Sequence, residues 1–312
     1  MARRRAGRPE RSVPFPHLGP TDEPIRIATG TARLLPETDG SVTVEVNGVP
    51  SSAQHPDPTH LIFEYMRWMR AAVRATLDAE DHPLHEVEAP AIAHLGGGAC
   101  SLPRALAAHY PRAQQWVVEI DGLLTEHART WFDLPRSPAL RIRQGDAADV
   151  LADWRPDRFD VLIRDVFDQD ATPERLRDAR AAADAARVLR PGGLYLANCA
   201  DIPGSGLLAD EVMTLRTAFS HVGVIAEPGH LTGRRRGNCV LLASDEPLAA
   251  GIDRAVRTDA VTVRLLPTDR VDRIAAGGSV TRRPAEAPEH NDGRGGAIAP
   301  PHPVSPGPFT DR

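Results

Sequence analysis

Three aspartates gather in one short stretch of the sequence, FDVLIRDVFDQDATP. Asp165 ends an apolar run, and Asp168 and Asp170 follow it in a predicted loop. Carboxylates at the mouth of a site suit a cationic substrate, and one of them can accept a proton from an attacking amine. The alternative is a turn followed by a helix, because Thr172 and Pro173 are typical of an N-cap and a first-turn proline. That alternative explains Asp170 better than it explains Asp165.

Three consecutive glycines, Gly96, Gly97 and Gly98, lie in the stretch LGGGACSLPRALA, between an apolar run and a helical pattern. Glycine allows a tight turn and lets a ligand approach the backbone without meeting a Cβ atom. In an open parallel sheet, the first turn between a strand and a helix is the usual cradle for a phosphate or nucleoside. Ser101 stands where a full GxGxxG motif has its last glycine, which weakens the case for a pyrophosphate. A tight turn that binds no ligand is the other interpretation.

Acidic residues follow the next two apolar runs. Glu119 and Asp121 end the run VVEID about 20 residues after the glycines, where a carboxylate can accept hydrogen bonds from both ribose hydroxyls of a nucleoside. We prefer Glu119 for this role, and a solvated carboxylate at a strand end is the alternative. The later triplet QGDA supplies Asp146 for an adenine amino group, with Ala147 beside it. These residues together predict a nucleoside site.

The elements that must position these residues begin near Ala89, where short apolar runs alternate with helical patterns. This alternation indicates βαβ units and a parallel sheet covered on both faces. The last two runs are too close together for a crossover helix, so we expect them to pair as an antiparallel hairpin. The predicted fold class is α/β, with a Rossmann-like seven-stranded methyltransferase sheet. The predicted strands are 91–95, 116–120, 140–143, 159–165, 194–199, 222–227 and 239–244, and the predicted helices between the early ones cover 102–110, 123–131 and 175–189.

The segments outside this sheet have other patterns. Alternating residues from Ile25 to Val49 predict a small β-hairpin unit, and helical spacing after Thr59, a predicted N-cap, indicates a helix that joins this unit to the larger domain. Both ends of the chain are poor in large apolar side chains, so we expect them to be disordered. The predicted organisation is a disordered tail (1–22), a small N-terminal β unit (23–58), a Rossmann-like catalytic domain (59–250), a C-terminal extension (251–276) and a second disordered tail (277–312).

The composition argues against several classes of protein. The chain has 312 residues, of which 41% are hydrophobic, which is enough for a packed core. It contains no run of about eighteen apolar residues, as a membrane helix needs, and no apolar signal segment, so we expect a cytoplasmic protein without a membrane partner. The formal net charge of −5 does not favour nucleic acid as a partner. Widely spaced cysteines, and histidines without an HExxH motif, predict no disulfides and no metal site.

The order and spacing of several motifs resemble one family. The stretch from about Val42 to Ser244 is similar to the polyamine aminopropyltransferases (spermidine synthases), specifically to their spermidine synthase-like bacterial branch. The matching motifs are VEVNGVP, DPTHLIFEY, HLGGGACSLPRALA, VVEID, QGDAADVL, FDVLIRDVFD, VLRPGGLYLANCAD and GNCVLLAS. The resemblance implies a small β unit followed by a class I methyltransferase fold. It also implies that an amine attacks the aminopropyl carbon of decarboxylated S-adenosylmethionine and releases methylthioadenosine.

The resemblance assigns roles to individual residues. It implies that Glu119 holds the ribose and Asp146 the adenine. It further implies that Asp165 is the base that deprotonates the amine, that Asp168 helps to bind an ammonium group, and that Glu64 is a substrate-binding glutamate. Family members are commonly dimers through the N-terminal unit, so a homodimer is an expectation of the same kind.

Three positions depart from the family pattern. Ala99 replaces the aspartate that binds the aminopropyl ammonium, Ser51 replaces a glutamine, and Ile62 replaces a tyrosine. A hydrogen bond to a charged group is worth about 1.5–3 kcal/mol, so the joint loss of these contacts is enough to abolish diamine recognition. Two alternatives therefore stay open beside aminopropyl transfer. One is a methyltransferase that uses intact S-adenosylmethionine on an unidentified acceptor, and the other is a nucleoside-binding protein without catalysis.

Overall fold

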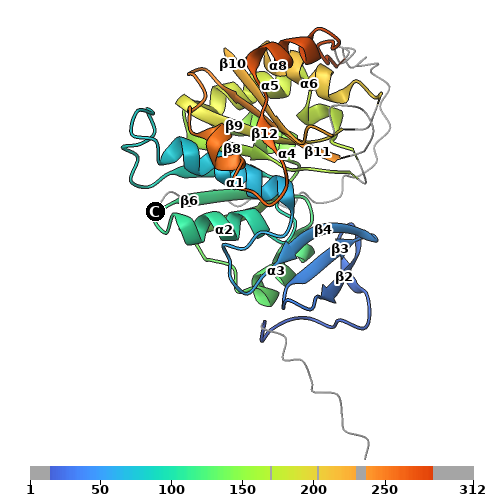
Figure 1. Ribbon diagram of the computed structural model, residues 1–312. Coiled ribbons are helices and arrows are strands. Elements are labelled where there is room, and N and C mark those ends of the chain that lie inside the picture. Colours follow the sequence, from blue (N-terminus) through green and yellow to red (C-terminus); the bar gives the residue numbers. More distant parts are fainter. Residues whose placement is uncertain (1–14, 169–170, 202–203, 230–236, 284–312) are drawn as a thin grey trace, which may run out of the picture.

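The computed structural model describes residues 15–168, 171–201, 204–229 and 237–283 (Figure 1). The larger sheet within these ranges has eight strands in the order β12-β10-β11-β9-β8-β5-β6-β7. The expected α/β fold with a Rossmann-like sheet is confirmed, and the short strand β12 extends the seven predicted strands at one edge. The strands are β5 (Ala91–Leu95), β6 (Gln114–Glu119), β7 (Leu140–Gln144), β8 (Phe159–Arg164), β9 (Leu189–Asp201), β10 (His221–Ala226), β11 (Gly237–Ser244) and β12 (Arg264–Leu265).

The strand order places a switch point in the middle of this sheet. From β5, the chain continues to β6 and β7 on one side, whereas β8 and β9 lie on the other, and all five strands are parallel. The predicted hairpin is confirmed, because β10 pairs with β11 in antiparallel register. In open α/β sheets, ligands bind beyond the carboxyl ends of the strands at such a switch point. The loops that follow β5 and β8 are therefore the expected place for a site.

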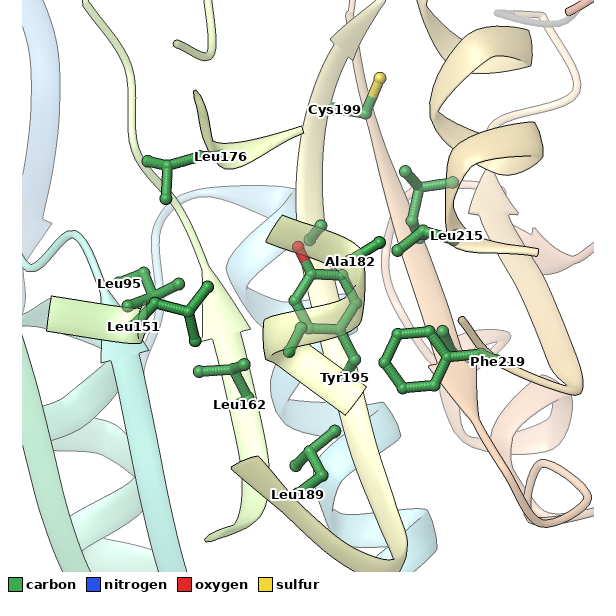
Figure 2. Packing of buried hydrophobic residues seen from close by; sticks show 14 of the residues in the cluster. Leu95, Leu151, Leu162, Leu176, Ala182, Leu189, Tyr195, Cys199, Leu215 and Phe219 are labelled. Atoms are coloured by element: carbon green, nitrogen blue, oxygen red, sulfur yellow. The ribbon is translucent and has the colours of Figure 1, made fainter. Parts of the chain in front are cut away.

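Helices cover both faces of the sheet (Figure 1). Strand residues alternate between the faces, so Ile92 and Ile163 pack with α1, α2 and α7, whereas Ala93 and Leu162 pack with α4, α5, α6 and α8. Figure 2 shows part of the second cluster, in which Tyr195 lies beside Phe219. None of the helices within the described ranges is long and apolar enough to cross a bilayer. The helices are α1 (Glu64–Leu77), α2 (Ser101–His109), α3 (Gly122–Trp131), α4 (Ala147–Asp153), α5 (Ala179–Val188), α6 (Leu207–Leu215), α7 (Ile252–Val256) and α8 (Thr268–Ala275), with a 3-10 turn η1 (Glu174–Leu176).

The N-terminal unit is a four-stranded antiparallel sheet rather than a single hairpin. Its strands are β1 (Ile25–Ile27), β2 (Gly30–Pro36), β3 (Val42–Val46) and β4 (Val49–Gln54). Leu34 and Val44 are fully buried and belong to one cluster with Leu124 and Trp131 of α3. Figure 1 shows this sheet beside α3, at the end of the molecule away from α6 and α8. The alternating pattern thus forms a second, smaller sheet that packs on the main domain.

Two predicted helix starts are wrong. Helix α1 begins at Glu64, because the Thr59 hydroxyl and amide bind the Asp57 carboxylate in a preceding turn instead of capping a helix. Thr172 is buried and caps no helix, since η1 begins only after Pro173 and carries no side-chain cap. The cap of α5 is Asp178, whose carboxylate accepts a hydrogen bond from a backbone amide in the first turn of the helix. Asp170 lies outside the described residues.

Both predicted tails contribute residues to the packed structure. Phe15 is 7% exposed, and its ring meets the Phe132 ring edge-on with 5.1 Å between centroids. At the other end, the Ser279 amide donates to the Asp210 carboxylate, and the Thr281 amide donates to the Thr214 hydroxyl. Residues 15–22 and 277–283 therefore belong to the fold, although their composition resembles that of the tails.

Candidate functional site at the carboxyl ends of the strands

The glycine loop after β5 packs too tightly for any side chain at its first two positions. Gly96 has φ +85°, and a Cβ atom there would lie 2.2 Å from the Asp165 carbonyl oxygen. A Cβ atom on Gly97 would lie 2.4 Å from the Val117 side chain. Gly98 has φ +50° and faces the hydroxyl of Ser52 on β4. The three glycines are thus required by close approach of β6, β8 and the N-terminal sheet, and they leave the loop backbone accessible from outside.

Glu119, at the end of β6, lies directly against this loop. Its Oε2 accepts hydrogen bonds from the Gly97 amide at 2.9 Å and the Gly98 amide at 2.8 Å. Its Oε1 accepts from the Asp121 amide at 3.1 Å. The carboxylate is half-buried, so its remaining lone pairs are available to donors from solvent or a ligand. The structure therefore brings the predicted glycine loop and the predicted ribose carboxylate together.

Asp121 has a different role from Glu119. Its carboxylate is buried and accepts from the Ala28 amide at 3.1 Å, from the Thr29 amide at 2.7 Å and from the Thr29 hydroxyl at 2.8 Å. It also caps α3 through the Leu124 amide at 2.8 Å. Burial opposes ionisation of this group, but the hydrogen bonds from Leu124 and Thr29 outweigh it and lower the pKa of Asp121. These bonds tie the N-terminal sheet to α3, so Asp121 serves the fold rather than facing a ligand.

Asp146 and Ala147 lie at the end of the next strand, β7. Asp146 is the N-cap of α4, and its Oδ1 accepts from the Ala148 amide at 2.8 Å. Its Oδ2 forms an ion pair with Arg175 at 3.1 Å, and 42% of its side chain is exposed. Ala147 is buried as the first residue of α4. Asp146 thus stands at the surface expected for an adenine ligand, while Ala147 packs beneath it.

Two large apolar side chains stand exposed on the same edge of the sheet. Ile120 is 59% exposed and directly follows Glu119, and Leu123 is 40% exposed in the first turn of α3. The Ile120 carbonyl accepts a hydrogen bond from Gln144 at the end of β7, so this residue lies between the ends of β6 and β7. Apolar surface next to carboxylates fits a ligand with a flat apolar face and polar edges.

Asp165 follows β8 and is held by side chains from two other elements. Its Oδ2 accepts from the Tyr65 hydroxyl of α1 at 3.0 Å, and its Oδ1 accepts from the Asn198 amide of β9 at 3.0 Å. Burial raises the pKa of Asp165, although both hydrogen bonds and the charge of Arg164 act in the opposite direction. Asp168 lies farther along the same loop, where it is exposed and pairs through its backbone with Ala171.

Tyr65 and Asn198 are site residues that the sequence analysis missed. Tyr65 stands at a buried position of α1, where an apolar residue is expected, and Asn198 lies inside an apolar stretch of β9. Glu64, the predicted substrate residue, is exposed at the start of α1. Successive helical residues point about 100° apart, so Glu64 and Tyr65 do not face Asp165 together, and it is Tyr65 that contacts it.

Ala99 ends the glycine loop and is fully buried beneath β4. Its amide donates to the Ser52 hydroxyl at 2.9 Å, and its carbonyl accepts from the Gln54 side chain at 2.5 Å. The methyl group at this position offers no hydrogen bond to an ammonium group. The other two departures, Ser51 and Ile62, are half-buried. The Ala99 backbone is therefore fixed by hydrogen bonds to β4, but the side chain lacks the carboxylate that the family pattern has at this position.

The cysteine after Ala99 is a packing residue. Cys100 has φ +62°, in the left-handed region that favours glycine, and it is 1% exposed. Burial, assisted by the nearby Glu119 charge, raises the pKa of the Cys100 thiol to about 12, so the thiol stays protonated at neutral pH. Within the part of the chain that the structure describes, no cluster of three or more His, Cys, Asp or Glu side chains is placed to hold a metal ion.

Comparisons with known proteins identify relatives of this chain. A probable spermidine synthase from Corynebacterium glutamicum, known from a crystal structure, is 34% identical to this chain. It covers 86% of this chain and 98% of its own, with a TM-score of 0.78. The chain belongs to the spermidine synthase family. No general family model matches it.

Curated relatives match shorter segments of this spermidine synthase family member. The polyamine aminopropyltransferase of Vibrio vulnificus is 31% identical over 127 residues, which are 40% of this chain and 41% of that protein. The mouse "eEF1A lysine and N-terminal methyltransferase" is 29% identical over 185 residues, which are 54% of this chain and 25% of that protein. The chain thus spans less than half the length of either curated relative. Both are transferases by name, one for aminopropyl groups and one for methyl groups.

Proposed function

We propose that this family member binds decarboxylated S-adenosylmethionine or S-adenosylmethionine beyond the ends of β5 to β8 and transfers the aminopropyl group to an amine. The nucleoside part of the proposal rests on Glu119 and Asp146, which flank the exposed Ile120. Two carboxylates beside an apolar surface match the ribose hydroxyls, the adenine amino group and the flat face of the base. The residues present therefore fit an adenosyl compound.

The observation that carries the transfer chemistry is the Asp165 carboxylate at the switch point. The attacking amine nitrogen forms a bond to the aminopropyl carbon, and the carbon–sulfur bond breaks with its electrons moving to the sulfonium sulfur. Methylthioadenosine leaves as a neutral thioether. The nitrogen gives up one proton, which the Asp165 carboxylate accepts. Burial makes Asp165 a stronger base than an ordinary carboxylate, and the bonds from Tyr65 and Asn198 hold it in one orientation.

The acceptor amine is the part of the proposal where this chain differs from the family pattern. A diamine carries two charges, and the positions of Ala99, Ser51 and Ile62 supply none of the three polar contacts that the resemblance implies. Asp168 is the exposed carboxylate beside Asp165 that remains for an ammonium group. We therefore propose an amine as the class of acceptor.

Calorimetric titration tests the nucleoside part. S-Adenosylmethionine, its decarboxylated form and methylthioadenosine are titrated in parallel into the full chain. Preference for the decarboxylated form supports aminopropyl transfer, and preference for the intact form contradicts it. Absence of binding by all three nucleosides would overturn the proposed site.

Replacement of Asp165 tests the chemical part. Asp165→Asn should abolish turnover of decarboxylated S-adenosylmethionine with an amine panel, while the affinity for methylthioadenosine stays within about twofold, because the base does not hold the nucleoside. The matched control is Asp157→Asn, an exposed carboxylate just before β8, at the opposite end of that strand from Asp165. Turnover by the Asp165 variant at the wild-type rate would contradict the assignment of the base.

A methyl transfer reaction is the second candidate. Ala99 favours methyl transfer, because intact S-adenosylmethionine keeps its own carboxylate and needs no protein carboxylate at the position of Ala99. The similarity to the mouse methyltransferase is in line with this alternative. The same titration separates the candidates, since tighter binding of the intact nucleoside supports methyl transfer.

A further inference from the structure

A buried ion pair lies directly behind the proposed base. Arg164, the last residue of β8, and Glu211 of α6 are each only 2% exposed, and Nη2 of Arg164 is 2.6 Å from Oε2 of Glu211. Arg164 occupies the position immediately before Asp165, so its side chain points to the opposite face of the sheet. Burial lowers the pKa of Arg164, but the Glu211 charge and the other groups around it outweigh burial and raise the pKa, so the guanidinium carries its charge.

The guanidinium joins three segments that surround Asp165. Its Nη1 donates to the Leu176 carbonyl at 3.1 Å, at the end of the loop that starts with Asp165. Its Nη2 donates to the Asn198 carbonyl at 3.1 Å. Asn198 is the residue whose side-chain amide binds the Asp165 carboxylate. Arg164 thus holds the backbone of the residue that orients the base, as well as the far end of the loop that contains it.

The pair is poorly arranged for stability alone. Nε of Arg164, Oε1 of Glu211 and Oδ1 of Asn198 are buried, and none has a hydrogen-bond partner within the described ranges. The pair also borders a small pocket, lined in part by Tyr195 and Thr214. Figure 2 shows Tyr195 in the apolar cluster on this face, with Leu176 and Leu215 around it. A buried ion pair with unmatched polar atoms is often no more stable than an apolar pair of similar volume.

We propose that Arg164 and Glu211 are positioning residues for the reaction: the pair fixes Asn198 and the loop end at Leu176, and through them the orientation of the Asp165 carboxylate. The inference rests on the proposed function in one respect, namely that Asp165 acts as the base. It explains why two charges are buried on the face of the sheet opposite to the Asp165 side chain, since the forked guanidinium binds two carbonyls and a carboxylate in fixed directions.

The charged and titratable groups around Asp165 are few among the described residues. Tyr65 faces it from α1, and its own pKa is raised well above the ordinary value by burial, so it remains a neutral donor. Arg164 is the cation behind it, Asn198 is the neutral donor from β9, and the glycine loop approaches with backbone only. Both Asn198 and Arg164 lower the pKa of Asp165. Loss of the ion pair between Arg164 and Glu211 should therefore raise the pKa of Asp165.

The test replaces both charges at once. Arg164→Met with Glu211→Met keeps an apolar pair of similar volume, whereas either single change would leave a buried charge without its partner. The second variant, Arg164→Gln with Glu211→Gln, keeps the site polar in case the apolar pair does not fold. The matched control is Asp160→Asn with Arg190→Met, which removes an ion pair at the other end of β8.

Three measurements are made on each variant: thermal stability, kinetics with the preferred nucleoside and amine, and the titration of Asp165 by NMR of ¹³C-carboxyl aspartate. The Asp165 signal is assigned from its absence in Asp165→Asn. In a folded pair variant we expect kcat to fall about tenfold to a hundredfold with nucleoside affinity unchanged, and the Asp165 titration to move to higher pH. The control should change stability alone.

A folded pair variant with wild-type kcat and an unchanged Asp165 titration overturns the inference. A fall in kcat that is matched by the control variant also overturns it, because activity would then follow stability. Absence of turnover in the wild type contradicts the proposed function instead. In that case the titration of Asp165 still decides whether the ion pair positions this carboxylate.

Discussion

At the scale of single residues, the burial of Asp165 affects both its pKa and the stability of the fold. The fold raises its pKa by burial, and the side chains that donate to its oxygens among the described residues, Tyr65 and Asn198, are neutral. An acid with a raised pKa in the folded state binds its proton more tightly there than in the unfolded chain. Its ionisation therefore costs folding free energy at every pH above the raised pKa, and the cost is absent below the unfolded value. Such a cost is expected of a base that the fold keeps away from water.

The raised pKa of Asp165 predicts how Asp165→Asn changes the stability of the protein. Asparagine is neutral at every pH, so the variant should melt at a higher temperature than the wild type near pH 8, and the difference should shrink as the pH is lowered towards about 5. Thermal melts across this range measure the difference. The matched control is Asp168→Asn, which removes an exposed carboxylate of the same loop and should show no such trend. A difference in melting temperature that stays the same as the pH is lowered would contradict the raised pKa.

At the scale of elements, the N-terminal sheet forms one wall of the glycine loop. Ser52 and Gln54 of β4 bind both backbone groups of Ala99, and Ser101 of α2 donates to the Ala53 carbonyl. Asp121 makes the second connection, from the start of α3 to the turn after β1. The small sheet is thus part of the site's scaffold, because the loop would lose its buried partners without it.

The second connection leads to a prediction about Asp121. Asp121→Ala removes the cap of α3 and three hydrogen bonds to the N-terminal sheet, so we expect a loss of about 2–4 kcal/mol in the free energy of unfolding. Denaturation with urea measures it. The control is Glu126→Ala on an exposed position of the same helix, which should cost less than about 0.5 kcal/mol. Equal losses in the two variants would show that Asp121 does not join the elements.

At the scale of the whole molecule, residues 277–283 pack across the helices on the face that carries the buried ion pair. The Ala179 amide at the start of α5 donates to the Thr281 carbonyl, and Arg283 pairs with the buried Asp178 at 2.5 Å. Gly278 approaches α6 so closely that a Cβ atom would lie 2.3 Å from the Ala209 carbonyl oxygen. This segment therefore closes the outer layer of the domain.

Truncation at two places separates this segment from the rest of the C-terminus. A chain that ends at Arg283 should melt within about 2 °C of the full chain, whereas one that ends at Ala276 should lose about 2–4 kcal/mol, because the carboxylates of Asp178 and Asp210 lose their partners. Thermal melts with chemical denaturation measure both. Identical stability of the two truncated chains would contradict a structural role for this segment.

The sequence by itself determined the local features of this protein. The strands 91–95 and 159–165 are rich in apolar residues because both of their faces are buried, and such runs are visible without any knowledge of the fold. The glycine loop, Glu119 and Asp146 are visible in the same way, because they follow the apolar runs 91–95, 116–120 and 140–143. The difference from the family pattern at Ala99 is likewise visible from a single position of the sequence. Each of these depends on residues that are neighbours in the chain.

The tertiary structure alone decided which side chains surround the base. Tyr65 and Asn198 are separated from Asp165 by 100 and 33 residues, and Glu211 from Arg164 by 47. Such contacts depend on the rotation of α1 and α6 and on the register of β9, which periodicity does not specify. The same applies to Asp121, whose sequence context is that of a ligand carboxylate and whose partners come from a separate sheet. Local pattern thus predicted which residues lie at the ends of the strands, and packing between distant segments decided which of them contact one another.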